Sequence, residues 1–586
     1  MMLGNLLKSL LRFPGQNRRA RRARSLFDAG LAQMQSLDYE SARRSLEQSV
    51  ALDPDAAEAH YWLGILLARD PQSYSASAQH LERALELNPD ITDGWANLGG
   101  VYYFQRDFAR AGASFRAALA ADPDSVLAQC NLGLLLKECG RPDEALVHLR
   151  RAHELAPEAK DTLRNLVVTL IGSDRCEEAL AVAAQAVERN SASYEAQLFH
   201  GMAHQKLHDP HRALACYETA MKMRPDDAEL HDCRGSTFQE LGLLAQAVEC
   251  FDRAVALRPD FALPAFHRAM ARLLLGDYRR GWDDYELRQL EGDCPSWGDA
   301  FPRWDGSSLA GRTLLLYREQ GLGDEIMFAS CLPQLIGAAR HCVVECEPRL
   351  LGILRRSFPS ATVYASTPDG ALPREIAECG IDVAIPAGSV PRFIRRGLDD
   401  FPRHQGYLKA DPERIASWRE RLDQMGSGLK VGIAWAGGVR KTRRALRSIP
   451  LERWRPVLQT PAVHFASLQY TADAGATVAA LREQHGVRVE HWNEAISDYE
   501  ETAALVCALD LVISVCTAVI HLGGALGRPV WVLAPYSPEW RYGFTGDTMP
   551  WYPSVKIFRQ PAFGEWEPVI SSAAAELRRL AGAPAG

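Results

Sequence analysis

The 586-residue sequence lacks three features, and each absence excludes a class of protein. No apolar run approaches the roughly 18 residues that a membrane-spanning helix needs, so we expect no transmembrane segment. The thirteen cysteines form no C-x-x-C pair or other metal-ligand spacing, which predicts free thiols in a reducing compartment and a cytoplasmic location. Positive charge is not in excess: the formal net charge is −7, so we do not expect nucleic acid to be the main partner.

We also expect no export signal at the N-terminus. The chain begins MMLGNLLKSLLRFPGQNRRARRAR, which is apolar first and basic afterwards. A secretory signal has the opposite order and ends at a small-residue cleavage site. We therefore expect residues 1–20 to be a basic leader ahead of the first helix. Contact of this leader with an anionic membrane surface is the alternative.

Repeats dominate the first half of the chain. The phrases ALDPD, ELNPD, AADPD, ELAPE, KMRPD and ALRPD recur, and the gaps between their prolines are 35, 34, 34, 68 and 34 residues. The gap of 68 is twice 34, and Ser191 stands where the missing proline would fall. The prolines are Pro54, Pro89, Pro123, Pro157, Pro225 and Pro259. A period of this length predicts stacked pairs of helices.

Two apolar stripes face each other within one such unit, residues 90–123. They consist of Trp95, Leu98 and Tyr102 on the first helix and of Ala111, Phe115 and Ala118 on the second. We expect Gly99 to lie where the two helices cross closely, and Pro123 to end the pair because proline cannot continue a helix. The pattern resembles the tetratricopeptide repeat. Eight units are expected over residues 21–289, and the last departs from the pattern and is expected to cap the stack.

A stack of these units predicts an α-solenoid over residues 21–293 with a long concave surface. Such a surface normally binds a peptide or a protein, so we predict that the repeats recruit a protein partner. The alternative is that they only support or dimerise the rest of the chain, which leaves a homodimer open.

The pattern changes after a linker at residues 294–312 that is rich in Gly, Pro and Trp. Short apolar runs then alternate with amphipathic segments: TLLLY, HCVVECE, ATVYAS and DVAIP, followed by KVGIAWA, VHFASLQY, RVEHW, DLVISV, PVWVLAP and VKIFRQ. Apolar strands separated by helices indicate parallel sheets with both faces covered. We predict two nucleotide-binding-type lobes, residues 313–410 and 411–586, which face each other across a cleft and bind ligands at the carboxyl ends of their strands.

Candidate site residues follow three of these strands. In GLGDEIMF, Gly321 and Gly323 are expected to permit a tight turn that leaves Asp324 at the mouth of the cleft. In the second lobe, Thr517 starts a short helix whose amide groups favour a diphosphate, and His521 can face the same ligand. A loop with two glycines and five cations follows KVGIAWA: Gly437, Gly438, Arg440, Lys441, Arg443, Arg444 and Arg447.

These motifs resemble bacterial glycosyltransferases related to lipopolysaccharide heptosyltransferases (glycosyltransferase family 9-like). The resemblance covers residues 313–560 and rests on GLGDEIMF, on VGIAWAGG with RS after it, and on SVCTAVIHLGGALGRPVWVL followed by PWYPSVKIFRQ. It implies an α/β GT-B domain with two Rossmann-like lobes after the α-solenoid. With its repeats, the chain resembles bacterial protein glycosyltransferases, including those that modify flagellin.

The resemblance also implies a role for each candidate residue. Asp324 is expected to be the general base that takes the proton from an acceptor hydroxyl. The diphosphate of a nucleotide-sugar donor is expected to bind at the 440–447 segment, Thr517, Ala518 and His521, without a metal or another cofactor. Simple displacement at the anomeric carbon is expected to invert its configuration. One position departs from the family: Cys516 stands where Asp or Asn is usual, and a thiol cannot accept a sugar hydrogen bond as a carboxylate does.

The predicted function is transfer of a sugar to a Ser or Thr hydroxyl of a protein that the repeats recruit, with flagellin as the first candidate. Two alternatives stay open: a non-catalytic repeat scaffold with a degenerate transferase domain, and an enzyme that acts on a glycan.

Simpler structural roles are the alternatives for single residues. Asp324 is expected to cap its helix as well as to act as base. The 440–447 segment can instead be a solvated loop, and His521 can instead be structural. Cys331 and Cys516 are expected to be buried thiols rather than nucleophiles.

Overall fold

The computed structural model describes residues 14–291, 300–367, 371–438 and 444–582. The chain forms two compact units, Met1–Pro225 and Asp226–Gly586. The division between the two units lies within the repeats, between the sixth and the seventh helix pair. It therefore does not coincide with the predicted end of the solenoid, and the predicted domain boundaries stay predictions. No helix in the described ranges has the length and apolarity to cross a membrane.

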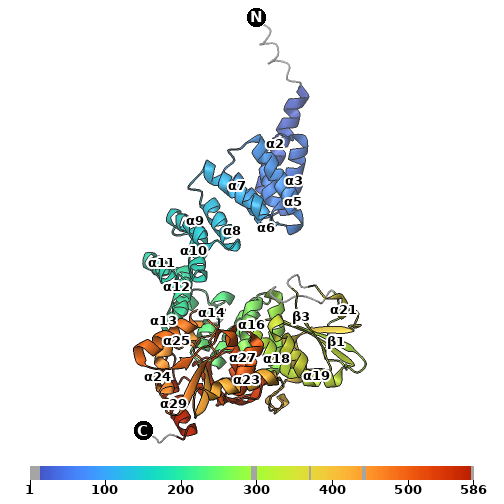
Figure 1. Cartoon of the computed structure of the whole chain (residues 1–586). Coiled ribbons are helices and arrows are strands. Elements are labelled where there is room, and N and C mark those ends of the chain that lie inside the picture. Colours follow the sequence, from blue (N-terminus) through green and yellow to red (C-terminus); the bar gives the residue numbers. More distant parts are fainter. Residues whose placement is uncertain (1–13, 292–299, 368–370, 439–443, 583–586) are drawn as a thin grey trace. The chain divides into compact units, whose positions relative to one another are not determined.

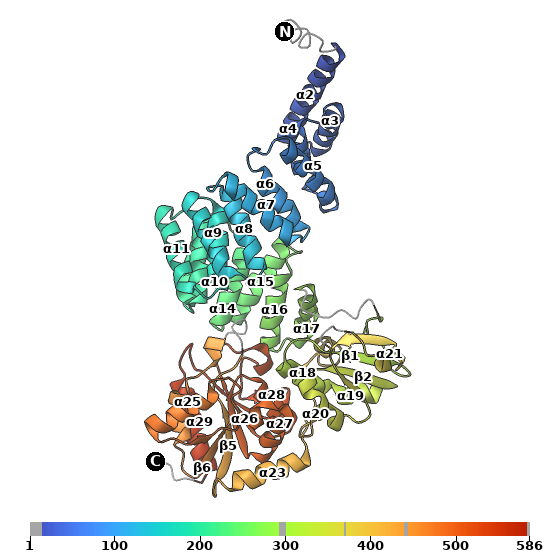
Figure 2. The same ribbon diagram turned by 45° about the horizontal axis from the view of Figure 1, so that its top comes forward.

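Pairs of helices make up the described part of the first unit, and Figures 1 and 2 show them following one another in sequence order. The pairs are α2 (Pro14–Gln35) with α3 (Tyr39–Leu52), α4 (Ala57–Leu67) with α5 (Tyr74–Leu87), α6 (Gly94–Phe104) with α7 (Phe108–Ala121), α8 (Val126–Glu138) with α9 (Pro142–Leu155), α10 (Lys160–Gly172) with α11 (Cys176–Arg189), and α12 (Tyr194–Lys206) with α13 (Pro210–Met223). The side chains of Asp38, Asp107 and Asp209 cap second helices by accepting from the backbone N–H three residues later.

Close helix crossing at Gly99 is confirmed. A Cβ atom on Gly99 would lie 2.5 Å from the ring of Phe115, so only glycine lets α6 approach α7 this closely. Gly201 faces the ring of Tyr217 in the same way, at 2.4 Å. Each of these glycines makes room for a ring of its partner helix, which explains the recurrence of glycine in the repeat pattern.

Gly99→Ala is expected to destabilise the first unit by about 1–3 kcal/mol, because the new methyl group overlaps the Phe115 ring in a packed interior. Urea unfolding followed by circular dichroism measures this change. The next residue supplies the control: a Cβ atom on Gly100 meets nothing within 4 Å, so Gly100→Ala is expected to be neutral or to stabilise by up to about 1 kcal/mol. Equal stability of the two variants would contradict the close crossing.

The second unit begins with two more helix pairs, α14 (Ala228–Glu240) with α15 (Leu244–Leu257) and α16 (Ala262–Leu275) with α17 (Tyr278–Tyr285). Together with the first unit they give the predicted eight pairs between residues 14 and 291. The last pair differs from the expected cap. Trp282 is fully buried, donates from Nε1 to the carbonyl of Arg395 at 2.8 Å, and packs edge-on against Trp540. This pair is therefore part of the core of the α/β region.

Two mainly parallel sheets follow. The first has the order β3-β2-β1-β4, and the second has the order β10-β11-β9-β8-β5-β6-β7, with only β10 antiparallel to its neighbour. Their strands are β1 (Thr313–Tyr317), β2 (His341–Cys346), β3 (Thr362–Ala365), β4 (Val383–Pro386), β5 (Leu429–Ala434), β6 (Val463–Ser467), β7 (Val489–Glu490), β8 (Leu511–Val515), β9 (Val530–Ala534), β10 (Thr548–Met549) and β11 (Tyr552–Arg559). Every strand predicted from the apolar runs is present, and β10 was not predicted.

Both faces of each sheet are covered, as the continuous apolar runs predict. In β8, Ile513 packs in one hydrophobic cluster and its neighbour Val512 in another, on the opposite face. Figure 2 shows α25 and α29 on one side of the larger sheet and α27 and α28 on the other. The main helices of the α/β region are α18 (Leu322–Phe328), α19 (Leu332–Ala338), α20 (Leu351–Ser357), α23 (Pro412–Asp423), α25 (Ala474–His485), α27 (Tyr499–Ala508), α28 (Ala518–Ala525) and α29 (Glu567–Leu580).

Candidate active site

A cavity of about 500 Å³ lies between the two sheets, at the carboxyl ends of their strands. Small-molecule sites have volumes of roughly 300–1,000 Å³, so the cavity can hold a ligand of that class. Its walls come from α18, from the loops after β5, β6 and β9, and from the first turns of α27 and α28. Both lobes contribute side chains, which is the arrangement expected of a site in a cleft.

Nine of the predicted site residues line this cavity: Gly321, Gly323, Asp324, Gly438, Arg447, Cys516, Thr517, Ala518 and His521. Gly437 lies beneath it, where a Cβ atom would meet the Thr517 methyl group at 2.3 Å. Arg444 is exposed in a short 3-10 turn and is not part of the wall. Arg440, Lys441 and Arg443 lie outside the described residues.

Asp324 does not cap its helix. Helix α18 begins after Gly321 without a side-chain cap, and Asp324 Oδ1 instead accepts from Arg541 Nε at 2.7 Å and also from its Nη2. The expectation of a helix cap is wrong because the guanidinium offers a charged donor across the cavity, and charge-assisted bonds are stronger than a bond to a neutral amide. The Asp324 carboxylate is thereby held at the boundary between the two lobes.

Gly321 and Gly323, which precede Asp324, do not supply the left-handed residue of the predicted tight turn. The left-handed backbone conformation falls on Gln320, whose φ is 62°, and not on Gly321 or Gly323. At Gly323 a Cβ atom would lie 3.1 Å from the ring of His521. Gly323 therefore allows α18 of the first lobe to approach α28 of the second.

Charged side chains of alternating sign cross the cavity. From Asp324 the chain of ion pairs continues through Arg541 to Glu539, at 3.2 Å, and from Glu539 to Arg447 Nη1, at 2.5 Å. Burial lowers the pKa of Arg541, but the negative charges of Asp324 and then Glu539 raise it by more than burial lowers it. The pKa of Arg541 is therefore raised above its ordinary value. The carboxylates hold both guanidinium groups at fixed positions in the wall.

The start of α28 is built for an anion. Thr517 is its N-cap, since Oγ1 accepts from the Val519 N–H at 3.3 Å, and Ala518 follows in the cavity wall. His521 is buried, with Nδ1 3.2 Å from the Tyr552 hydroxyl. Burial, and then Arg541, lower the pKa of His521 to about 3. The imidazole is therefore neutral, and it offers a hydrogen bond rather than a charge.

Cys331 and Cys516 are buried thiols, as predicted. Burial raises the pKa of Cys516 to about 12 and also raises that of Cys331. Neither is a thiolate near neutral pH, so neither is a ready nucleophile.

Arg541, Arg349 and Tyr499 are among the cavity residues that were not predicted. Arg541 lies in η10 (Trp540–Tyr542) after β9, and Arg349 lies in η4 (Pro348–Leu350) after β2. The rule that ligands lie beyond strand ends pointed to both loops but not to these side chains. Tyr499, at the start of α27, has a buried hydroxyl without a hydrogen-bond partner among the described residues. A buried polar group of this kind is satisfied when a ligand occupies the cavity.

Comparisons with known proteins identify the repeats. A tetratricopeptide repeat profile matches residues 27–92, 67–126 and 97–160, and a second one matches residues 194–227 and 234–261. Protein FlbA of Caulobacter vibrioides is 30% identical over 536 residues, which span 87% of this chain and 88% of that protein. Anaphase-promoting complex subunit 3 of Schizosaccharomyces pombe is 25% identical over 175 residues, 29% of this chain and 26% of that protein.

Among solved structures, a tetratricopeptide repeat protein from Parabacteroides merdae is similar, with a TM-score of 0.37 and 14% identity over 42% of this chain and 98% of that one. The first 280 or so residues are thus tetratricopeptide repeats, followed by a mixed α/β region.

Proposed function

The chain belongs to the same family as protein FlbA, and from its sequence motifs and its cavity we propose that it is a protein glycosyltransferase. In this proposal the repeats bind a protein acceptor and the α/β region moves a sugar from a nucleotide-sugar donor to a Ser or Thr hydroxyl. The observation that carries the proposal is the cavity between two parallel sheets, with Asp324 on one side and cations and a helix N-terminus on the other. Two such sheets are compatible with a GT-B arrangement.

Donor binding is assigned to the second lobe. Arg447 and Arg541 supply positive charge for a diphosphate, and the N-terminus of α28, which begins at Ala518 in the cavity wall, favours an anion. The buried Tyr499 hydroxyl supplies a further polar contact. These groups stabilise the nucleoside diphosphate as it leaves the sugar, which is where negative charge accumulates.

Asp324 acts as general base once the donor is bound. The donor diphosphate competes for Arg541, and this competition releases the carboxylate from its ion pair. The acceptor oxygen then forms a bond to the anomeric carbon and gives its proton to Asp324. The bond from that carbon to the diphosphate breaks, and the nucleoside diphosphate keeps the electron pair. The configuration at the anomeric carbon is thereby inverted.

The acceptor is proposed to be a protein because eight helix pairs offer far more surface than a sugar needs. Flagellin is the first candidate, by the family resemblance alone. A glycan acceptor is the alternative within the same chemistry.

A second candidate function is a scaffold without catalysis. The observation that favours it is the chain of ion pairs, in which each of Asp324, Arg541, Glu539 and Arg447 already has a partner of opposite charge. A degenerate site would keep such a network for stability alone. The buried, neutral thiol of Cys516 at a position where the resembled family has Asp or Asn is consistent with the same view.

Thermal unfolding with a panel of UDP, GDP, CMP, ADP and dTDP sugars distinguishes these candidates. A donor present at 100 times its Kd is expected to stabilise the protein by about 2.7 kcal/mol and to raise its Tm. Arg447→Met is expected to lose this shift because Arg447 lines the cavity, whereas Arg444→Met on the exposed side of the same turn is expected to keep it. No shift with any donor would favour the scaffold.

A further inference from the structure

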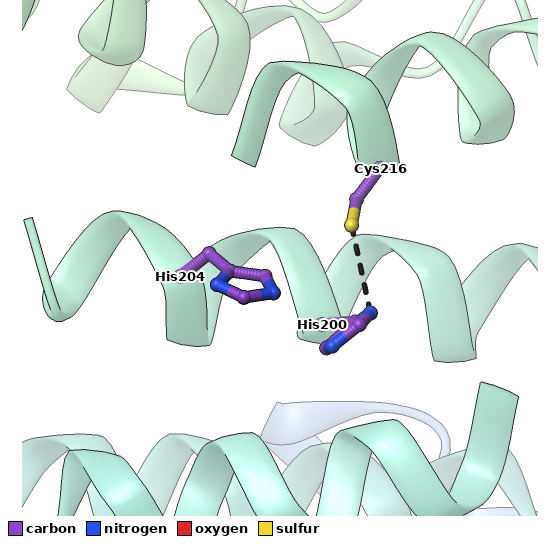
Figure 3. Close-up of side chains that lie close together, drawn as sticks. All are labelled: His200, His204 and Cys216. Carbon is purple, nitrogen blue, oxygen red and sulfur yellow. Dashed lines mark hydrogen bonds between the residues drawn. The ribbon is translucent and has the colours of Figure 1, made fainter. Parts of the chain in front are cut away.

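Two histidines and a cysteine come together in the first unit, far in sequence from the candidate active site. His200 and His204 lie one turn apart on α12, and Cys216 lies on the facing helix α13 (Figure 3). The Cys216 Sγ atom is 3.5 Å from His200 Nδ1, and the two imidazole rings have centroids 4.6 Å apart. One ligand atom from each residue lies within 4.8 Å of the other two.

We propose that His200, His204 and Cys216 form a binding site for a divalent transition metal, with zinc as the first candidate. Zinc favours nitrogen and sulfur ligands, with bonds of roughly 2.0–2.1 Å to nitrogen and 2.3 Å to sulfur. In a tetrahedral site these bond lengths place a sulfur and a nitrogen ligand about 3.5 Å apart, which agrees with the distance between Cys216 and His200. Three protein ligands leave the fourth position for water or for a group of a bound partner.

The repeat fold does not require these three side chains. At a spacing of 34 residues, the preceding repeat has apolar residues at the corresponding positions: Leu166, Leu170 and Val182. The following repeat has Arg234 and Phe238 in place of the histidines and keeps only the cysteine, Cys250. Only His204 of the three is buried, and a partly or fully buried imidazole or thiol packs less favourably than leucine or valine unless its polar atoms have partners. The set is specific to one helix pair, which favours a ligand-binding role over packing.

The charged neighbours of the three side chains are Asp209 and Arg212, which pair with each other at 3.4 Å. Asp209 acts electrostatically on both His204 and Cys216, and Arg212 acts on His204 with the opposite sign. Among the described neighbours, the negative Asp209 is therefore near both Cys216 and His204, and the positive Arg212 is near His204.

The cysteine spacings of the sequence give no sign of this site. The ligands follow no linear metal motif: the histidines are four residues apart, and the cysteine follows after twelve more, on another helix. A pair of histidines at this spacing on a helix presents both rings on one face. Only the helix pairing of the repeat brings the thiol to them.

Titration of the reduced, full-length protein with Co²⁺ tests the proposal. A tetrahedral site with one thiolate is expected to give visible d–d bands and a sulfur-to-cobalt charge-transfer band, saturating at one Co²⁺ per chain, and Zn²⁺ is expected to remove both. Cys216→Ser is expected to lose the charge-transfer band. His204→Leu, which restores the residue type of the preceding repeat, is expected to weaken Zn²⁺ binding by at least about tenfold.

Cys250→Ser is the matched control because it changes the corresponding position of the next repeat, and it is expected to leave the bands unchanged. Circular dichroism verifies that each variant is folded, and His200→Leu replaces any variant that is not. Absence of the charge-transfer band in the wild-type protein, or its persistence in Cys216→Ser, would overturn the proposal. The outcome is independent of sugar transfer.

Discussion

Asp324→Asn is expected to lower the rate of sugar transfer by about 10²–10⁴-fold, the usual contribution of a general base. Asparagine has nearly the same size but cannot accept the proton of the acceptor hydroxyl. Donor binding is expected to persist or to tighten, because Arg541 loses its carboxylate partner and is free for the diphosphate. Initial rates with saturating donor, together with the donor-induced rise in Tm, measure the two effects separately.

The control for this variant is Asp547→Asn, which changes an exposed carboxylate of the second lobe and is expected to leave both quantities unchanged. Unchanged transfer in Asp324→Asn would remove Asp324 as the base. Loss of donor binding together with transfer would mean that the carboxylate holds the cavity open through Arg541, and its role would then be structural.

The ion pair between Asp324 and Arg541 also gives the proposed reaction an order. Before the donor binds, the carboxylate is engaged by a guanidinium and is a poor acceptor for a proton. When the diphosphate takes its place beside Arg541, the base becomes available at the moment when the sugar is in position. Premature proton transfer from an acceptor is thereby disfavoured without a moving lid.

Much of the fold could be predicted because its signals are local. The 34-residue period depends on helix faces within single repeats, and Gly99 follows from the close crossing of two neighbouring helices. The strands appear as apolar runs because both faces of each sheet are covered. Strand β10 was missed because two residues, one of them exposed, leave no such run.

The site could be predicted only in part, since its cross-lobe contacts have no local signal. Asp324 was found from the glycines beside it, but its partner Arg541 lies 217 residues later, in a loop where many side chains were equally plausible. A left-handed backbone conformation is usual for glycine, so no local signal predicted it at Gln320, beside Gly321. Pairings of this kind depend on how the two sheets face each other, which no single motif encodes.

Glu319→Gln is expected to destabilise the second unit by about 3 kcal/mol, because it removes the more buried of the two carboxylates that pair with Arg288 and leaves only Glu286, at 3.2 Å. Glu319 accepts from Arg288 Nε at 2.9 Å and from Nη2 at 2.6 Å, and the side chains are 2% and 6% exposed. The pair joins the turn after the last repeat helix to the loop after β1, next to Asp324. Urea unfolding of the full chain, followed by tryptophan fluorescence, measures the loss.

Two further variants separate the charge from the packing. Glu567→Gln removes one partner of the exposed pair with Arg453 and is expected to leave the unfolding midpoint unchanged. The double change Arg288→Met and Glu319→Leu removes both charges and is expected to recover most of the stability, because two apolar groups of similar volume avoid the cost of an unpaired buried ion. If Glu319→Gln were as stable as the wild-type chain, the ion pair would not join the repeats to the α/β region. If only the double variant were stable, the pair would hold the last repeat in register with the loop that carries Asp324 rather than add net stability.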